Sequence, residues 1–335
     1  MGSGSARQWL KLVRFQTGAA TAAPAVFGAI LLMPKNEIDV IHLVLLFIMG
    51  LLFHCFGFAL NEYSDIEVDR HSRYLSGKPL LKGTIIKQHA LYAAFVFISI
   101  ASAMAVVFFT DIRALAAFFI AVILGAVYDL YGKKFFGADL VLGGFIFFLT
   151  LFGALTVCYE LTAVVYIAAF LFFIQLSFQT GVTGGMKDIP HDRLAGAKTS
   201  PVYLGCSVVG KNLIVTAEFK AYAYIQKAIH TAIILLPFWL LLFTLQEPVL
   251  FQLAILSILI LLMWASTIRA LTQSTFDRLK LMRLLGAQEV ATYPMVSILV
   301  MGVIGIWPAM FLLLLPIFWM AIFLYIIYGK FMPDV

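Results

Sequence analysis

A series of apolar segments, each long enough to cross a lipid bilayer, is the feature that most constrains this sequence. A helix needs about 20 apolar residues to span a hydrocarbon core of about 30 Å. Of the 335 residues, 63% are hydrophobic and 12% are charged, and the mean hydropathy is +1.01. This composition excludes a soluble globular protein. It predicts an all-α integral membrane protein.

The apolar segments predict ten membrane spans. The last two are separated only by Trp307-Pro308, which is either a turn between two helices or a kink in one long helix, because proline interrupts helical hydrogen bonds. We expect the spans at Thr17–Met33, Val40–Leu60, Gln88–Thr110, Ala114–Leu130, Ala138–Cys158, Leu161–Thr180, Ala228–Leu245, Val249–Ala270, Ala291–Ile306 and Ala309–Tyr328.

The basic residues predict the orientation of these spans. With the N-terminus in the cytoplasm, 21 of the 23 Lys and Arg residues lie in cytoplasmic segments, and only Lys35 and Arg113 lie outside. This distribution obeys the positive-inside rule. Both acidic motifs described below then fall on the cytoplasmic face. The net charge of +6 is explained by insertion and phosphate binding, so we expect no nucleic-acid partner.

The first residues and the cysteines add little to the prediction of fold and function. Residues 1–5, MGSGS, look like a cloning remnant, and residues 6–335 are expected to form a single membrane domain. Cys55, Cys158 and Cys206 have no paired spacing, which argues against both disulfides and a zinc site.

A first acidic motif occupies residues 61–70 and reads NEYSDIEVDR. Asn61, Asp65 and Asp69 recur every four residues, so on a helix they share one face, with Glu62 beside it. Like charges at this spacing repel, and the repulsion grows at a membrane edge. Mg²⁺ would neutralise them and keep positions open for substrate phosphates. For an isolated pair of this kind, a solvated acidic helix end is the alternative.

A second acidic motif occupies residues 184–199 and reads GGMKDIPHDRLAGAKT. Asp188 and Asp192 are again four residues apart, and basic residues flank them. Each motif directly follows an apolar segment. Two such motifs favour one composite site that holds a diphosphate through metal ions.

The two motifs resemble signatures of the UbiA superfamily of intramembrane prenyltransferases. The first is similar to N-D-x-x-D-x-x-x-D and the second to D-x-x-x-D, continued by D-R-x-A-G-x-x-T, and their order and spacing fit over nearly the whole chain. The resemblance implies a bundle of nine helices around a central cavity capped by cytoplasmic loops, and a tenth helix would be an addition. It also implies Mg²⁺-dependent transfer of a polyprenyl group from an isoprenyl diphosphate. The acceptor would be an aromatic ring, such as a naphthoate or hydroxybenzoate, or a lipid precursor, such as geranylgeranylglyceryl phosphate.

The resemblance further assigns roles to individual residues. Two Mg²⁺ ions, replaceable by Mn²⁺, would be held by the catalytic residues Asp65, Asp69, Asp188 and Asp192, together with Asn61. Membrane lipids are further expected partners. The substrate-binding residues would be Asn61, Glu62, Arg70, Lys78, Tyr128, Lys133, Lys134, Lys187, Arg193 and Lys198.

Two positions depart from the family pattern. Glu62 stands where Asp is usual, which keeps the charge but lengthens the side chain. The usual Arg-Pro pair after the first motif is replaced by Lys78-Pro79, two residues late.

Several alternatives stay open at this point. Lys133 and Lys134 are either diphosphate ligands or orientation anchors, and segments 198–227 and 278–283 are either surface amphipathic helices or ordinary structure. The alternative function is a multi-pass transporter whose acidic clusters bind a coupling cation. Transporter sites lie near the midplane and often come with inverted repeats, whereas these acids cluster at one edge. A silent, lipid-binding family member is a third reading, against which the intact acidic pairs argue.

Overall fold

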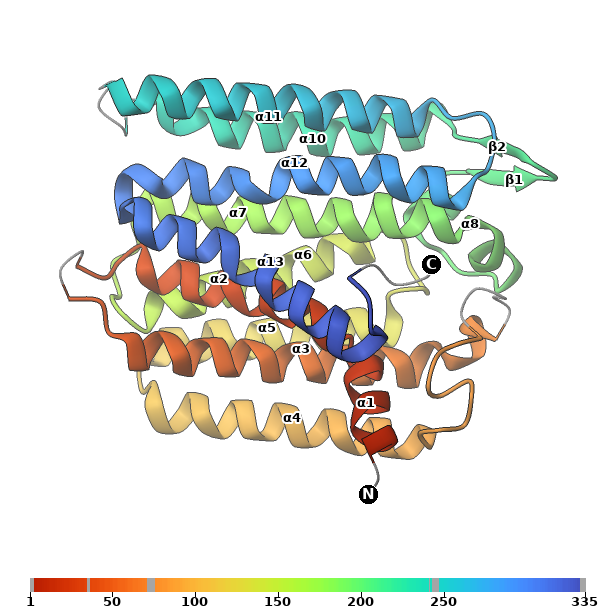
Figure 1. The fold of residues 1–335 in the computed structure, drawn as a ribbon, viewed down its shortest axis with the longest axis horizontal. Helices are drawn as coiled ribbons and strands as arrows, with labels where there is room; N and C mark the ends of the chain where they lie inside the picture. The colour runs from red at the N-terminus through yellow and green to blue at the C-terminus, as the bar shows by residue number, and fades with distance from the viewer. Residues whose placement is uncertain (1–2, 35–36, 71–75, 241, 243–246, 332–335) are drawn as a thin grey trace. The chain divides into compact units, whose positions relative to one another are not determined.

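The computed structural model describes residues 3–34, 37–70, 76–240, 242 and 247–331, which are largely helical (Figure 1). The all-α prediction is confirmed, apart from one short hairpin. In chain order the elements are α1 (Ser3–Leu12), the 3₁₀ turn η1 (Phe15–Thr17), α2 (Gly18–Ile30), α3 (Val40–Asp69), α4 (Lys87–Phe108), α5 (Ile112–Tyr131), α6 (Ala138–Leu155), α7 (Ala163–Phe178), the π-helix η3 (Gln179–Gly184), α8 (Gly185–Leu194), α9 (Ser200–Tyr203), β1 (Ser207–Val209), β2 (Asn212–Ile214), α10 (Ala217–Trp239), α11 (Glu247–Leu271), α12 (Arg278–Ile304) and α13 (Ile306–Tyr328).

A helix occupies each of the ten predicted spans, although residues 241 and 243–245 of the span predicted at Ala228–Leu245 lie outside the described residues. Among the described residues, eight helices are long and apolar enough to cross a membrane, and one of them runs without interruption through α7, η3 and α8 from Ala163 to Leu194. The two exceptions are α2, which has only 13 residues and reaches about 20 Å, and α10, which carries Lys227 and His230. Among the described residues, length and composition alone thus qualify eight helices as spans, and the expected count of nine or ten is not confirmed.

Helices α12 and α13 are two helices rather than one kinked helix. α12 ends at Ile304 and α13 begins at Ile306, and Gly305 between them has φ +90°. Only glycine adopts this backbone conformation readily. The break therefore falls two residues before the predicted Trp307-Pro308.

Helix α3 is longer than its predicted span and carries the first acidic motif. Asp39 caps its N-terminus by accepting a hydrogen bond from the backbone N–H of His42 at 3.0 Å. The span was expected to end at Leu60, but the helix continues to Asp69. The four-residue spacing in the motif therefore becomes one helix face.

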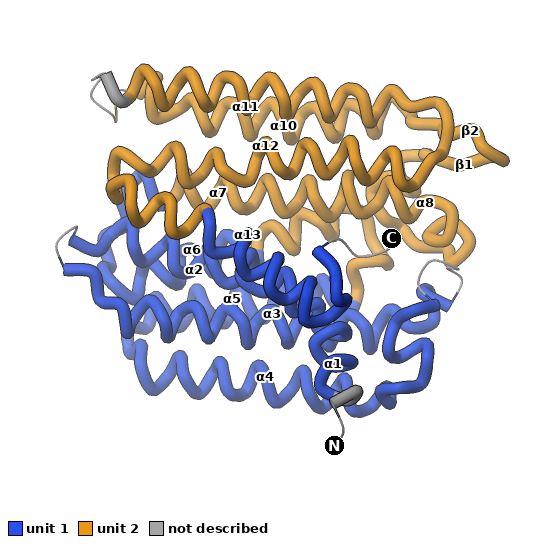
Figure 2. Tube along the Cα trace, in the orientation of Figure 1, with its two compact units in different colours: residues 1–130, 145–165, 314–335 blue, residues 131–144, 166–313 orange. Residues whose placement is uncertain are grey.

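The chain forms two compact units (Figure 2). Unit 1 comprises residues 1–130, 145–165 and 314–335, and unit 2 comprises residues 131–144 and 166–313.

In unit 1, small residues bring α2 against α3 and α6. A methyl group on Gly50 would lie 2.5 Å from Cα of Ala22, and one on Gly153 would lie 1.8 Å from the carbonyl oxygen of Ala25. Such close approach is typical of helix packing in membranes.

The core of unit 2 holds the helix of the second acidic motif. Phe178, Val182, Met186 and Ile189 form one buried row from α7 through α8. They belong to a cluster that includes buried residues of α10 and α12, and Figure 1 shows α10, α11 and α12 running alongside one another. The second motif thus lies on a helix with one face packed in the core of unit 2.

Neither candidate amphipathic segment is a surface helix. Residues 198–227 form α9, the antiparallel β1–β2 hairpin and the start of α10. Residues 278–283 are the first turns of α12, which starts at the Asp277 N-cap. Of the two alternatives that the sequence left open for these segments, the structure supports ordinary structure.

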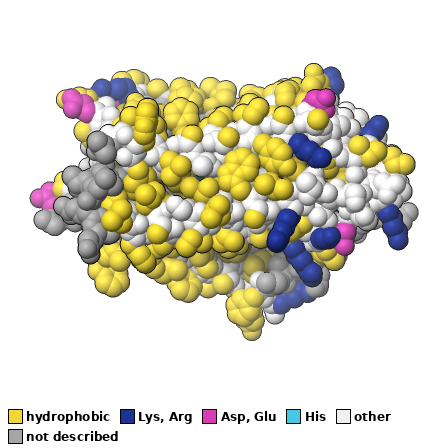
Figure 3. Space-filling model, turned by 90° about the horizontal axis from the view of Figure 1, so that it is seen from above, with side chains coloured by type: hydrophobic (Ala, Val, Ile, Leu, Met, Phe, Trp, Pro, Cys, Tyr) yellow, Lys and Arg dark blue, Asp and Glu magenta, His cyan; other side chains and the backbone are white. Residues whose placement is uncertain are grey.

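The surface seen in Figure 3 is covered largely by hydrophobic side chains. On α11, for example, Ile258, Leu261 and Leu262 are all exposed. Soluble monomers rarely expose apolar patches on this scale, so this surface fits a lipid environment.

Candidate active site

The first acidic motif occupies the last turns of α3, in unit 1. Asn61 Nδ2 donates a hydrogen bond to Asp65 Oδ2 at 3.3 Å, as expected for side chains one turn apart. Asp65 is half-buried, whereas Glu62 and Asp69 are each only 3% exposed. Arg70, at the helix end, is exposed and pairs with Glu67 at 3.0 Å. Asp65 is thus the most accessible of the motif's three predicted carboxylates.

Lys78 neutralises the two buried carboxylates. Its Nζ lies 2.6 Å from Glu62 Oε1 and 2.6 Å from Asp69 Oδ2, and Arg14 Nη2 lies 3.4 Å from the same Glu62 oxygen. The two positions that depart from the family pattern, Glu62 and Lys78, are therefore direct partners. The longer side chain of Glu62 and the displaced basic residue compensate each other.

Asp129 is a site candidate that sequence reasoning missed. Its side chain is buried near the end of α5 and lies close enough to Asp65 for electrostatic repulsion. The Ser64 hydroxyl donates to the backbone carbonyl of Asp129, and a methyl group on Gly57 would lie 3.3 Å from Asp129 Oδ2. Its neighbour Tyr128, a predicted ligand, is half-buried. An aspartate inside an apolar segment was the available signal.

The second acidic motif lies on α8, in unit 2. Arg278 Nη2, at the start of α12, lies 3.3 Å from Asp188 Oδ1, and the Asp188 side chain is 26% exposed. Asp192 is buried, with Lys133 Nζ at 3.8 Å from Oδ1 and Thr199 Oγ1 donating to Oδ2 at 3.3 Å. Each carboxylate of this pair therefore has a cation within reach.

The loop before α6 is tied to this motif. The backbone N–H of Lys198 donates to the carbonyl of Lys133 at 2.8 Å, which holds Lys133 near Asp192. Lys134 is exposed, and its ammonium lies 4.6 Å from the ring centroid of Tyr131. The structure thus separates two lysines that the sequence treated alike.

The remaining predicted ligands around α8 lie at its edges. Lys187 lies within electrostatic range of Glu289 on α12, and Arg193 and Lys198 are exposed. His191 is buried, with Nε2 at 3.9 Å and 3.7 Å from the nearest oxygens of Asp188 and Asp192. Arg278 was missed because its partner is 90 positions away in the sequence.

The donor set fits Mg²⁺ held jointly with phosphate. Within the part of the chain that the structure describes, no three His, Cys, Asp or Glu side chains form a preorganised metal cluster. Mg²⁺ commonly binds through one or two carboxylates together with substrate phosphates and water. Asp65 and Asp188, each the most accessible carboxylate of its motif, offer such oxygen ligands.

Comparison with known proteins identifies one family. Residues 21–286 match the model of the UbiA prenyltransferase family. No curated protein matches the sequence.

Solved structures share the fold at low sequence identity. A structure of digeranylgeranylglyceryl phosphate synthase is 17% identical, covers 90% of this chain and 100% of its own, and has a TM-score of 0.66. A UbiA homologue from Archaeoglobus fulgidus bound to GPP and Mg²⁺ is 20% identical, with coverages of 89% and 100% and a TM-score of 0.61. The apo UbiA homologue from Aeropyrum pernix K1 is 16% identical, with coverages of 86% and 95% and a TM-score of 0.61.

Proposed function

Because the chain belongs to the UbiA prenyltransferase family, we propose that it transfers a polyprenyl group from an isoprenyl diphosphate to an acceptor inside the membrane. The observation that carries the proposal is the pair of acidic motifs on α3 and α8. In the first motif the accessible Asp65 lies on the same helix as two buried carboxylates, which pair with Lys78. In the second motif the accessible Asp188 pairs with Arg278 and lies one turn from the buried Asp192, which has Lys133 nearby. Such an arrangement suits the binding of a diphosphate together with its metal ions better than the binding of a metal ion alone.

Four aspartates, Asp65, Asp69, Asp188 and Asp192, together with Asn61, would hold two Mg²⁺ ions. When bound, these ions supply Lewis-acid stabilisation of the negative charge that collects on the departing diphosphate. The A. fulgidus homologue has been solved bound to GPP and Mg²⁺ and bound to DMAPP and Mg²⁺, which supports Mg²⁺ as the ion.

The chain's own cations would assist the departure of the diphosphate. Lys133, Arg278 and Lys78 bring positive charge to the two motifs. Preorganised cations of this kind stabilise charge that develops in a transition state. The allylic C–O bond breaks with its electron pair leaving on pyrophosphate, the acceptor forms the new bond to the prenyl carbon, and the acceptor loses a proton.

The membrane position would protect this reaction. Water captures an allylic cation readily, so the apolar helices that surround the site must exclude it. The acceptor is an aromatic ring such as a naphthoate or hydroxybenzoate, or a lipid precursor such as geranylgeranylglyceryl phosphate. The likeness to digeranylgeranylglyceryl phosphate synthase supports the lipid class through its fold.

Both motifs and the N-terminus would face the cytoplasm. The support is the distribution of Lys and Arg, of which 21 of 23 fall on one predicted side. The diphosphate head group of the donor is charged and stays in contact with water, so a site that opens to the cytoplasm would be accessible to it.

The test is turnover under metal control. Purified full-length protein is incubated with geranylgeranyl diphosphate, Mg²⁺ and a panel of the named acceptors, and products are identified by mass. We expect product with one acceptor class, complete loss of product in excess chelator, and recovery on adding Mg²⁺ or Mn²⁺. Full turnover in excess chelator would overturn the metal-dependent proposal.

A further inference from the structure

We propose that a groove on unit 2, between α7 and α10, binds one acyl chain of a membrane glycerophospholipid, with Gln226 hydrogen-bonded to the ester carbonyl. The proposal concerns a site distinct from the acidic motifs, and it does not depend on prenyl transfer.

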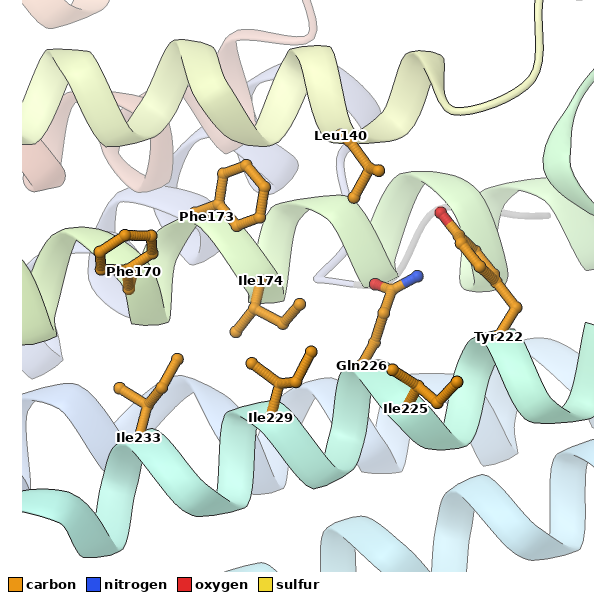
Figure 4. Close-up of a pocket in the computed structure, with 9 residues that line it drawn as sticks. All are labelled: Leu140, Phe170, Phe173, Ile174, Tyr222, Ile225, Gln226, Ile229 and Ile233. Atoms are coloured by element: carbon orange, nitrogen blue, oxygen red, sulfur yellow. The ribbon is translucent and has the colours of Figure 1, made fainter.

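The groove is apolar along most of its length. It encloses about 390 Å³ and is lined by side chains of α7 and α10, with Leu140 of α6 on a third side (Figure 4). Ile174 forms its floor and is 4% exposed, whereas Phe170, Ile225 and Ile229 at its rim are 47%, 59% and 45% exposed. A groove with a buried floor and an open rim on an apolar helix surface is accessible from the surrounding lipid.

One end of the groove is polar but uncharged. Gln226 is 4% exposed, and its amide nitrogen faces the Tyr222 hydroxyl oxygen. Within the described residues its amide oxygen and its second N–H have no hydrogen-bond partner. Figure 4 shows Gln226 and Tyr222 extending from α10 toward the same end of the groove. The Tyr222 hydroxyl already donates its only proton to Asp139, so it cannot donate to the Gln226 carbonyl. A buried amide with unmade hydrogen bonds is costly, and a ligand that accepts from the second N–H would remove part of that cost.

The chemistry of the lining selects the ligand. No Lys, Arg or His is among the described residues that line the groove, so it does not suit a diphosphate. A neutral acceptor oxygen next to a hydrocarbon chain satisfies both the second N–H of Gln226 and the apolar wall, and the ester of a glycerolipid has this structure.

The depth of the polar end agrees with this ligand. The sequence predicts a span that begins at Ala228, two residues after Gln226, and this span would place the amide at the edge of the hydrocarbon region. Ester carbonyls lie at this boundary, and the apolar part of the groove extends inward from it. From Gln226 to Ile233 the helix rises about 10 Å, so the groove can hold about 10 Å of the acyl chain along α10.

The test is photolabelling of the full-length protein in nanodiscs of phosphatidylcholine that contain a small fraction with a diazirine in one acyl chain. Labelled peptides are mapped by mass spectrometry. We expect labelling of residues 225–233 and 170–174 to exceed labelling of the lipid-facing residues Phe95 and Ile100 on α4. Gln226→Leu, which keeps the side-chain size, should lower groove labelling about two- to tenfold, the range for one net hydrogen bond.

Two controls separate the possible sources of the signal. Ile229→Trp should block the groove, whereas Ile100→Trp on α4 should leave groove labelling unchanged. Equal labelling of α4 and the groove, or unchanged labelling in Gln226→Leu, would overturn the proposal. Labelling of the groove by a diazirine analogue of geranylgeranyl diphosphate in place of the phospholipid would also overturn it. Prenyl transfer is measured separately and should be unchanged in Gln226→Leu, so failure of one proposal leaves the other intact.

Discussion

The two acidic motifs share one spacing but differ in how their charge is balanced. In the first motif, Lys78 lies 2.6 Å from both Glu62 and Asp69, and all three side chains are at most 15% exposed. In the second motif, Asp188 is 26% exposed, and its cation, Arg278, is 90 residues away in the sequence. The four-residue spacing places the carboxylates on one helix face, but the cationic side chains around them determine which carboxylate stays accessible. The first motif is a closed ion cluster with Asp65 at its edge, whereas the second is open at Asp188.

The largest effect is expected where the two motifs act together. Asp65→Asn and Asp188→Asn should each lower kcat about 10²-fold or more, the size of effect seen when a key electrostatic group is removed. The double variant should be scarcely slower than either single variant, because groups that act as a unit are non-additive in kinetics. The measurement is a double-mutant cycle on turnover.

A matched control for this cycle is Asp111→Asn, which changes a partly exposed carboxylate between α4 and α5. Its turnover should be normal. Additive losses in the double variant would mean that the two motifs serve separate purposes and belong to two sites instead of one.

The next largest effect concerns the closed cluster of the first motif. Lys78→Met should lower the free energy of unfolding by about 3 kcal/mol, because removing one partner of a buried ion pair leaves uncompensated charge. Thermal melting in detergent measures the loss. Lys82→Met, an exposed lysine four residues further along, should have no effect.

A second substitution tests the cause of this loss. Adding Glu62→Gln to Lys78→Met should recover part of the stability, because it removes one of the two stranded carboxylates. A double variant that melts no higher than Lys78→Met would show that the lysine acts through packing and not through charge.

The sequence predicted the local parts of this molecule well. The helical face of residues 61–69 and nearly all the spans follow from periodicity and hydropathy, which depend on neighbours in the chain. The link from Glu62 to Lys78, the approach of Asp129 to Asp65 and the pairing of Arg278 with Asp188 were not predicted. Each joins side chains from separate segments, and no local pattern encodes such distances. The β1–β2 hairpin was missed because each strand has only three residues.

A smaller effect is expected from the two lysines before α6. Lys133→Gln should raise the KM for the diphosphate donor about tenfold, because the ammonium 3.8 Å from Asp192 is charge that a diphosphate would share. Lys134→Gln is the matched control, since this side chain is exposed over Tyr131. The comparison is made on initial rates at varied donor and fixed acceptor. A KM that is unchanged in both variants would return both lysines to the role of orientation anchors.

The smallest effect, on the free energy of unfolding, is expected at the second motif, which is open at Asp188. Arg278→Gln removes the cation 3.3 Å from Asp188, but this carboxylate is partly exposed and water can solvate it when the guanidinium is gone. The free energy of unfolding without Mg²⁺ should therefore fall by about 1 kcal/mol or less, well below the loss expected for Lys78→Met. Melting curves of Arg278→Gln and of the exposed control Arg269→Gln, recorded beside Lys78→Met, measure the difference. A loss for Arg278→Gln as large as that for Lys78→Met would mean that the second motif is as closed as the first, and that access of a diphosphate to Asp188 requires the helices around it to move.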